Sequence, residues 1–192
     1  IPESVQSIGC DAFNSCSSLT EIELPQNVTE IAAGAFWNCG SLTGIRIPEG
    51  VVTIGEEAFG CCSSLTEVEL PESIKEMGRD AFCKTPWLDK KEAEQGCIIL
   101  GGILHRAAKS TEGVFRVPEG VTEIGEYAFH ECVHMTEVQM SDSVIKIGAY
   151  AFAGCTGLEK VQLSDGITEV PEYLFEGCSN LKVAEIPDGV VR

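Results

Sequence analysis

The chain has few basic residues: 13 Lys and Arg stand against 30 Asp and Glu, which gives a formal net charge of −17. No run of Lys or Arg interrupts this acidic background. Nucleic acids and anionic membrane surfaces would both be approached against net repulsion, so the composition argues against these two partners. A solvated acidic surface is the simplest interpretation of the charge.

Long apolar segments and targeting signals are also missing. No stretch approaches the roughly 18 consecutive apolar residues of a membrane-spanning helix, and the first residues lack the basic-then-apolar pattern of a secretory signal. The chain begins at Ile1 and ends at Arg192 inside a repeat, without the terminal caps that a solenoid needs. We therefore interpret the sequence as a fragment of a longer polypeptide, with no membrane insertion.

What the sequence does contain is a repeat. A Phe, usually preceded by Ala, is followed three residues later by Cys and three further on by Leu. The phenylalanines lie 23 residues apart except for one interval of 47, which is two periods plus one residue; they are Phe13, Phe36, Phe59, Phe82, Phe129, Phe152 and Phe175. A fixed period of this size predicts an array of stacked coils.

The repeat at residues 47–69 shows the expected structure of one coil. Apolar and acidic residues alternate towards the end of 65–70, which predicts a half-buried strand, and Pro71 ends that strand because it has no amide hydrogen. Pro-Glu-Gly marks a turn. A second extended piece at 51–54 is followed by Gly55 and by an expected helical turn over 56–59.

The apolar residues of each coil gain a core only when coils stack on one another. In the repeat that starts at Met140, we expect seven residues to face inward: Val144, Ile147, Ala151, Phe152, Cys155, Leu158 and Val161.

Cysteines at one repeat position predict a ladder of buried, reduced thiols instead of a disulfide framework. Side chains at equivalent positions run parallel, so their sulfur atoms do not point at each other. The ladder comprises Cys16, Cys39, Cys62, Cys132, Cys155 and Cys178. Four cysteines lie off it, and a bridge such as Cys61–Cys83 stays open: they are Cys10, Cys61, Cys83 and Cys97.

The consensus Ile/Leu-Pro-x-x-Val-x-x-Ile-Gly-x-x-Ala-Phe-x-x-Cys-x-x-Leu-x-x-Val resembles the BspA-like class of leucine-rich repeats over residues 1–82 and 117–192. The resemblance implies an α/β repeat solenoid, right-handed, with a parallel sheet on one side and short helical turns and extended segments on the other. It also implies a bacterial cell-surface or secreted protein that acts in adhesion and binds host proteins. The family has no catalytic residues to transfer.

The middle of the chain departs from the consensus. Regular repeats cover 1–92 and 117–192, and an irregular coil occupies 83–116. Its charged stretch after Trp87 has a helical composition, and the two apolar runs around a Gly-Gly pair in 97–105 predict a hairpin. We place Leu100-Gly101 at the Ile-Gly position of a repeat and expect a single array over 1–192; a flexible linker is the alternative.

No motif predicts catalysis or a metal. The densest cluster is His130-Glu131-Cys132-Val133-His134, but Cys132 belongs to the inward ladder, and the repeat positions of both histidines accept many residue types, which predicts surface exposure. Zinc needs about four converging ligands. Paired carboxylates lie on a solvated edge, and the repeated Ile-Gly is interpreted as turn chemistry. The sequence therefore predicts no enzyme and no cofactor.

Two surface features are candidates for binding. Outward strand positions should form an exposed sheet face with an acidic bias, which favours a basic or polar partner. The candidate residues are Glu21, Glu23, Arg46, Glu67, Glu69, Glu137, Gln139 and Gln162, with Gly44, Lys160 and Glu185 at equivalent positions. Tyr127, Tyr150 and Tyr173 form an aromatic row that either contacts a glycan or protein or packs on itself.

The function predicted from the sequence is a non-catalytic protein-interaction and adhesion module. The alternative is a structural spacer within a long surface protein.

Overall fold

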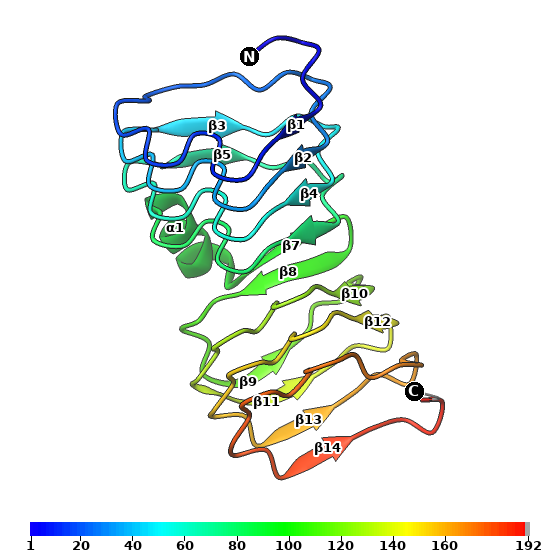
Figure 1. The fold of residues 1–192 in the computed structure, drawn as a ribbon. Helices are drawn as coiled ribbons and strands as arrows, with labels where there is room; N and C mark the ends of the chain where they lie inside the picture. Colours follow the sequence, from blue (N-terminus) through cyan, green and yellow to red (C-terminus); the bar gives the residue numbers. More distant parts are fainter. Residues whose placement is uncertain (191–192) are drawn as a thin grey trace. The chain divides into compact units, whose positions relative to one another are not determined.

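The chain folds into two compact units, Ile1–Glu94 and Gln95–Arg192, in a computed structural model that describes residues 1–190. Its coils form about eight turns of a β-solenoid with parallel sheets and little helix, which confirms the predicted fold class (Figure 1). Each unit has its own sheets. The single array over 1–192 stays a prediction.

Unit 1 (Ile1–Glu94) contains two parallel sheets. The first has the order β1-β2-β4-β6, and its strands are β1 (Ser7–Ile8), β2 (Glu30–Ile31), β4 (Thr53–Ile54) and β6 (Glu76–Met77). The second sheet pairs β3 (Gly44–Arg46) with β5 (Glu67–Glu69). Partners in both sheets are 23 positions apart, so the sequence period becomes the vertical register of the coils, as predicted.

Helix α1 (Pro86–Gln95) lies at the end of unit 1 and confirms the helical composition noted there. Thr85 begins it, because its hydroxyl accepts a hydrogen bond from the Leu88 amide at 3.2 Å. Trp87 is buried and packs against Phe82 with 4.8 Å between the ring centroids. The irregular sequence therefore still covers the apolar core of unit 1.

Unit 2 (Gln95–Arg192) begins with the predicted hairpin, in which β7 (Cys97–Leu100) and β8 (Ile103–Ala107) pair antiparallel. The sheet continues in parallel through β10 (Glu123–Ile124) and β12 (Lys146–Ile147). The second sheet has the order β14-β13-β11-β9, and its strands are β9 (Gly113–Arg116), β11 (Met135–Gln139), β13 (Lys160–Gln162) and β14 (Val183–Glu185).

Toward the following coil, Leu104 takes the Ile position of the repeat, while the placement of Leu100-Gly101 in phase with Met77-Gly78 stays a prediction. Leu104 pairs with Ile124 and is fully buried, so it occupies the Ile position, and Gly101 belongs to the hairpin turn with a φ of +54°. The physical reason is that the hairpin adds a strand before the coil resumes. Within unit 2, the second arm of the hairpin pairs with the next coil through β10.

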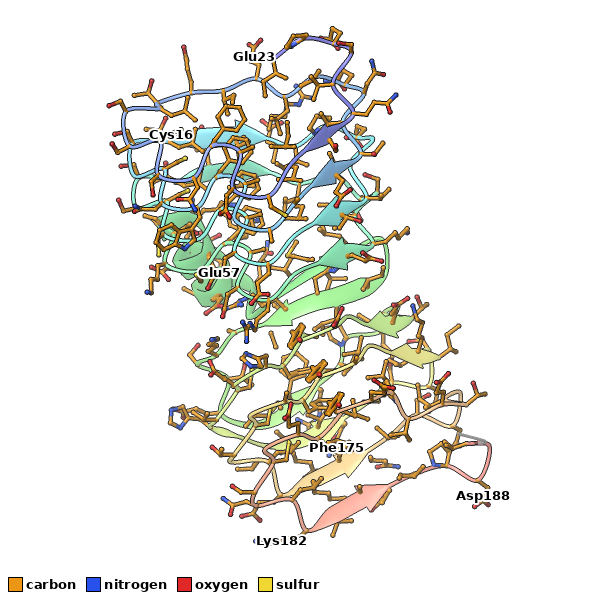
Figure 2. All side chains as sticks on the ribbon, viewed as in Figure 1. Cys16, Glu23, Glu57, Phe175, Lys182 and Asp188 are labelled. Atoms are coloured by element: carbon orange, nitrogen blue, oxygen red, sulfur yellow. The ribbon has the colours of Figure 1, made fainter. Side chains whose placement is uncertain are left out.

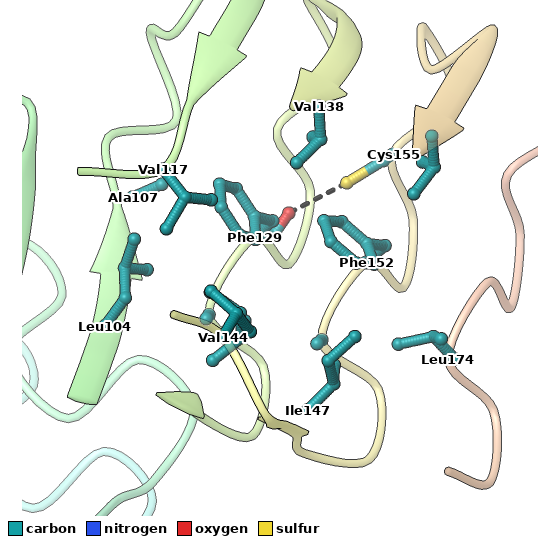
Figure 3. Packing of buried hydrophobic residues seen from close by; sticks show 14 of the residues in the cluster. Leu104, Ala107, Val117, Phe129, Val138, Val144, Ile147, Phe152, Cys155 and Leu174 are labelled. Carbon is teal, nitrogen blue, oxygen red and sulfur yellow. Dashed lines mark hydrogen bonds between the residues drawn. The ribbon is translucent and has the colours of Figure 1, made fainter. Parts of the chain in front are cut away.

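Stacked phenylalanines form the centre of each core, as predicted. Ring centroids lie 5.0 Å apart for Phe13–Phe36 and 4.9 Å apart for Phe129–Phe152, with interplanar angles of 1° and 16°. Figure 3 shows the second pair between aliphatic side chains from several coils. The seven residues expected to face inward in the repeat from Met140 are all at most 5% exposed.

The ladder thiols have a structural role that the sequence did not show. Four of the six donate a hydrogen bond to the carbonyl of the Phe in the preceding coil, as Cys62 does to Phe36 at 3.1 Å and Cys155 to Phe129 at 2.9 Å (Figure 3, dashed). Cys132 donates to Ala108 at 3.6 Å instead, because the irregular coil before it has no Phe at that position. All ten cysteines are free thiols. Burial raises the pKa of the Cys62 thiol to about 12. Only Cys16 departs clearly from the prediction, because no coil covers it on its outer side and it is exposed.

The expected helical turn over 56–59 is instead a pair of hydrogen-bonded turns. Glu57 and Cys61 both have positive φ, at 51° and 59°, and the same two repeat positions have positive φ in the other regular coils. Amides alternate in direction: Ala58 donates to Gly55 within the coil, and Phe59 donates to Ala81 of the next coil at 2.7 Å. In an α-helix, all these amides would instead donate to carbonyl groups of the same coil.

We expect Glu57→Gly to stabilise the protein. A side chain in the left-handed region costs about 1–2 kcal/mol, and glycine loses about 0.5–1 kcal/mol more entropy on folding, so the net gain should be about 0.5–1 kcal/mol. Glu57 (labelled in Figure 2) is exposed and is not part of the core. Urea denaturation measures the effect. Glu57→Ala is the control, because it removes the same side chain but keeps the Cβ; equal stability of the two variants would contradict backbone strain.

Candidate functional site

In unit 1 the outward side chains of β3, β5 and the segment before Leu24 form two columns. One column contains Glu21, Gly44 and Glu67, and the other contains Glu23, Arg46 and Glu69. Because side chains alternate along a strand, the residues between them face the core: Ile45 is 5% exposed. The five predicted unit 1 residues are all exposed, and they lie together as the sequence indicated. We call this surface the unit 1 sheet face.

The unit 1 sheet face is hollowed into a groove of about 590 Å³. Its lining consists of all five predicted residues together with Ile1, Ile22, Gly44 and Ile45. A second hollow of about 390 Å³ shares Ile1, Ile22, Glu23 and Arg46 with it. The sequence did not predict Ile22 as a surface residue, because the alternation of apolar and acidic residues around it indicated an inward position. In the structure its side chain is only half-buried.

The charge of this face is strongly one-sided. Four carboxylates, from Glu21, Glu23, Glu67 and Glu69, line the groove together with the guanidinium of Arg46, so these five side chains carry a net charge of −3. Arg46 Nε lies 3.3 Å from Glu69 Oε2, and both side chains are more than 70% exposed. An exposed pair of this kind contributes about 0–1 kcal/mol, so it leaves Arg46 free to exchange partners.

The predicted residues of unit 2 form a different surface. Glu137 and Gln139 lie on β11, and Gln162 lies beside Gln139 on β13. Gln139 donates a hydrogen bond to Glu137 at 2.8 Å, and Lys160 lies 3.3 Å from Glu185. The acidic bias expected for the whole sheet face is therefore found in unit 1, while the face of unit 2 balances its charges internally.

The three tyrosines form a continuous stack on unit 2. Ring centroids are 5.0 Å apart for Tyr127–Tyr150 and 4.7 Å apart for Tyr150–Tyr173, with interplanar angles of 13° and 8°. All three have φ of +56°, and desolvation in the stack raises the pKa of Tyr150. This geometry agrees with the self-packing interpretation. Tyr173 is 55% exposed, so one end of the row faces solvent.

The histidine cluster is only partly at the surface. His134 is exposed as predicted, but the exposure predicted for His130 was wrong: its side chain is 18% exposed and its ring packs edge-on against Tyr127 at 5.6 Å. The reason is that the neighbouring tyrosine covers it. Within residues 1–190, no three or more His, Cys, Asp or Glu side chains are grouped so that they could hold a metal ion.

No helix in the part of the chain that the structure describes is long and apolar enough to cross a membrane.

Comparison with known proteins identifies the family. The model of the BspA type leucine-rich repeat region matches residues 1–102 and 109–192 in six copies. The chain therefore belongs to the BspA type leucine-rich repeat proteins. No curated protein matches the chain in a sequence search.

Several solved structures are similar. A leucine-rich cell surface protein from Faecalibacterium prausnitzii is 31% identical over 97% of this chain, with a TM-score of 0.55. Leucine-rich repeat proteins from Bacteroides ovatus and T. pallidum are 30% and 31% identical over 97% and 88% of this chain, with TM-scores of 0.45 and 0.43. The matches cover 58%, 42% and 68% of those three chains. This chain therefore spans about half of the length of the first two relatives.

Proposed function

We propose that this chain is a non-catalytic protein-interaction module and that the unit 1 sheet face binds a basic or polar protein. The observation that carries the proposal is the groove whose lining brings four carboxylates around one arginine. Repeat solenoids commonly present an extended surface of this kind to a partner. A net charge of −3 on one face favours encounter with positive partners and selects against negative ones.

We also propose a bacterial cell-surface or secreted location and a role in adhesion. The similar F. prausnitzii protein is described as a cell surface protein, and this supports the location. The tyrosine row is a second candidate contact, for a glycan or a protein, because the face of Tyr173 is open to solvent. The competing hypothesis is a spacer, which would present the same surfaces without binding through them.

Charge reversal on the unit 1 sheet face separates these hypotheses. We expect Glu67→Lys with Glu69→Lys to change the face from −3 to +1 and to weaken capture of a basic partner about tenfold or more, because like charges then oppose each other. The measurement is quantitative mass spectrometry of proteins captured at physiological salt from the natural surroundings of the bacterium.

The matched control is Glu30→Lys with Glu49→Lys. It makes the same change of charge on exposed residues of unit 1 that lie outside the groove lining. Thermal melts followed by circular dichroism verify that both variants fold. A protein lost by the face variant and retained by the control supports the proposal; identical captured sets would support the spacer.

A further inference from the structure

The first coil separates from the strand β3 of the second coil along Glu21–Leu24. From Gln6 to Thr20 it is bonded to the second coil: the Thr29 amide donates to Gln6 at 2.9 Å, and the Thr43 amide donates to Thr20 at 3.3 Å. From Glu21 to Leu24, within the described residues, no backbone hydrogen bond joins it to β3. Figure 1 shows this blue segment as plain chain beside β3, and Figure 2 labels Glu23 on it.

This separation leaves one edge of β3 without a strand partner. In parallel pairing, alternate residues direct their backbone groups to opposite neighbours. The bonds from Glu67 to Thr43 and from Ile47 to Glu69 show that the odd-numbered residues around β3 face β5. The amide and carbonyl groups of Gly44 and Arg46 therefore point toward the separated segment, and no backbone or side-chain hydrogen bond is found for them among residues 1–190.

The groove of about 590 Å³ lies at this open edge. Glu21, Ile22 and Glu23 line one side, and Gly44, Ile45 and Arg46 of β3 line the other. At the far end of the sheet face of unit 2, β14 instead pairs with β13 at three consecutive positions. An outer coil in this fold can therefore pair fully, and the separation at Glu21–Leu24 is local.

We propose that the open edge of β3 accepts an added strand: an extended segment of a partner polypeptide in which Lys or Arg alternates with apolar residues. This inference rests on the proposed function, because it uses the same face. The added strand would bond to the backbone groups of Gly44 and Arg46, as in other proteins that extend a sheet with a peptide. Its outward side chains would meet carboxylates, and its inward side chains would meet Ile22 and Ile45.

Gly44 leaves space for a cationic side chain of the added strand. Neighbouring strands lie about 4.8 Å apart, so a strand added beside β3 lies about 10 Å from β5. Because Gly44 has no side chain, a long Lys or Arg side chain on the added strand can extend over it toward Glu67, while Glu21 approaches from the other side. The three atoms nearest to a Cβ on Gly44 would all belong to Glu67, the closest at an ordinary 3.5 Å, so the position accepts a small side chain.

Hydrogen exchange of the whole 192-residue chain tests the open edge without a ligand. We expect the Gly44 and Arg46 amides to exchange about a hundredfold or more faster than the Ile45 amide, because only Ile45 is bonded to a neighbouring strand. Equal protection of all three amides would show that the first coil closes on β3, and it would overturn the proposal.

A defined peptide tests the strand addition itself. The probe is a fluorescein-labelled acetyl-Lys-Val-Lys-Val-Lys-Val amide, and its comparison peptide replaces the central Val by Pro and keeps the charge. Anisotropy titrations should give at least about tenfold weaker binding for the Pro peptide, which lacks one amide and interrupts the extended strand. Equal affinities would mean that charge alone attracts the peptide, and they would contradict strand addition.

The matched variants are Gly44→Pro and Gly44→Ala. Gly44→Pro removes an amide that has no partner in the folded chain, so the fold should persist while binding of the Lys-Val peptide falls about tenfold; Gly44→Ala should change binding less than about threefold. Similar affinities of the two variants would overturn the proposal. The proposed function fails separately, if Glu67→Lys with Glu69→Lys leaves the natural partners bound.

Discussion

Replacing Phe152 by Ala is expected to lower the free energy of unfolding by about 3–5 kcal/mol. Phe152 is fully buried and lies between Phe129 and Phe175, at centroid distances of 4.9 Å and 5.6 Å. Its carbonyl also accepts the Cys178 thiol hydrogen bond at 3.0 Å. The substitution leaves a cavity that the rings on both sides cannot fill, because their own backbones are fixed by bonds between coils.

The control for Phe152→Ala is Glu159→Ala on the surface of the same repeat. Glu159 lies 3.0 Å from the Lys182 ammonium, and both side chains are about half exposed or more, so its removal should cost at most about 1 kcal/mol. Urea denaturation followed by far-ultraviolet circular dichroism gives both values. Equal losses for the two variants would contradict a core built on the phenylalanine column.

The phenylalanine column and the sheets were predictable because they depend only on the period. Once residues 23 positions apart become neighbours, Phe152 has to face the same side as Phe129, and the alternation around Val68 fixes which strand side chains are outward. Stacking therefore converts a linear repeat directly into a three-dimensional register. No long-range information beyond the period is needed.

The conformation of the bends could not be derived in the same way. Glu57 and Tyr127 both have positive φ, although neither residue type favours it. The signal lies in other coils: the position of Glu57 and Tyr127 holds Gly34, and the second bend position, that of Cys61, holds Asn38 and Gly154. A residue with low preference adopts this conformation because the bonds between coils, such as Phe59 to Ala81, fix the backbone around it.

The candidate site was predictable only as a set of exposed residues. Strand alternation placed Glu21, Glu23, Glu67 and Glu69 outward, and the structure places them there. The groove depends on the missing bonds between the first coil and β3, and nothing in the local sequence distinguishes Leu24-Pro25 from Ile47-Pro48 in the paired coil. The difference between the faces of units 1 and 2 likewise arises from cross-strand partners, such as Lys160 with Glu185.

Gly78→Ala is expected to destabilise the protein by about 3 kcal/mol, for a reason that corrects the sequence interpretation. The glycine of the repeated Ile-Gly was attributed to turn chemistry, but Gly55, Gly78 and Gly148 do not have positive φ. A Cβ on Gly78 would overlap the backbone of Glu56 in the preceding coil, well inside the 3.0 Å that real Cβ contacts respect. Glycine is required here because two backbones approach closely.

The overlap cannot be relieved by a side-chain rotation, since the atoms involved belong to the main chain. The two coils would have to separate, and this would lengthen the bond from the Gly78 amide to Ile54, now 2.7 Å, and the bond from Glu57 to Arg79, now 3.0 Å. Loss of such bonds at one interface weakens the stacking on which both coils depend, because each coil contacts only its neighbours.

The chain provides a matched control in Gly9, which holds the same repeat position in the first coil. A Cβ there meets no atom within 4 Å, so Gly9→Ala should change stability by less than about 1 kcal/mol and in the stabilising direction, through lower entropy of the unfolded chain. Thermal and urea denaturation of both variants would measure the contrast. If Gly9→Ala and Gly78→Ala were equally harmful, the glycine would be needed for its own backbone conformation, and close approach of the coils would not explain its repetition.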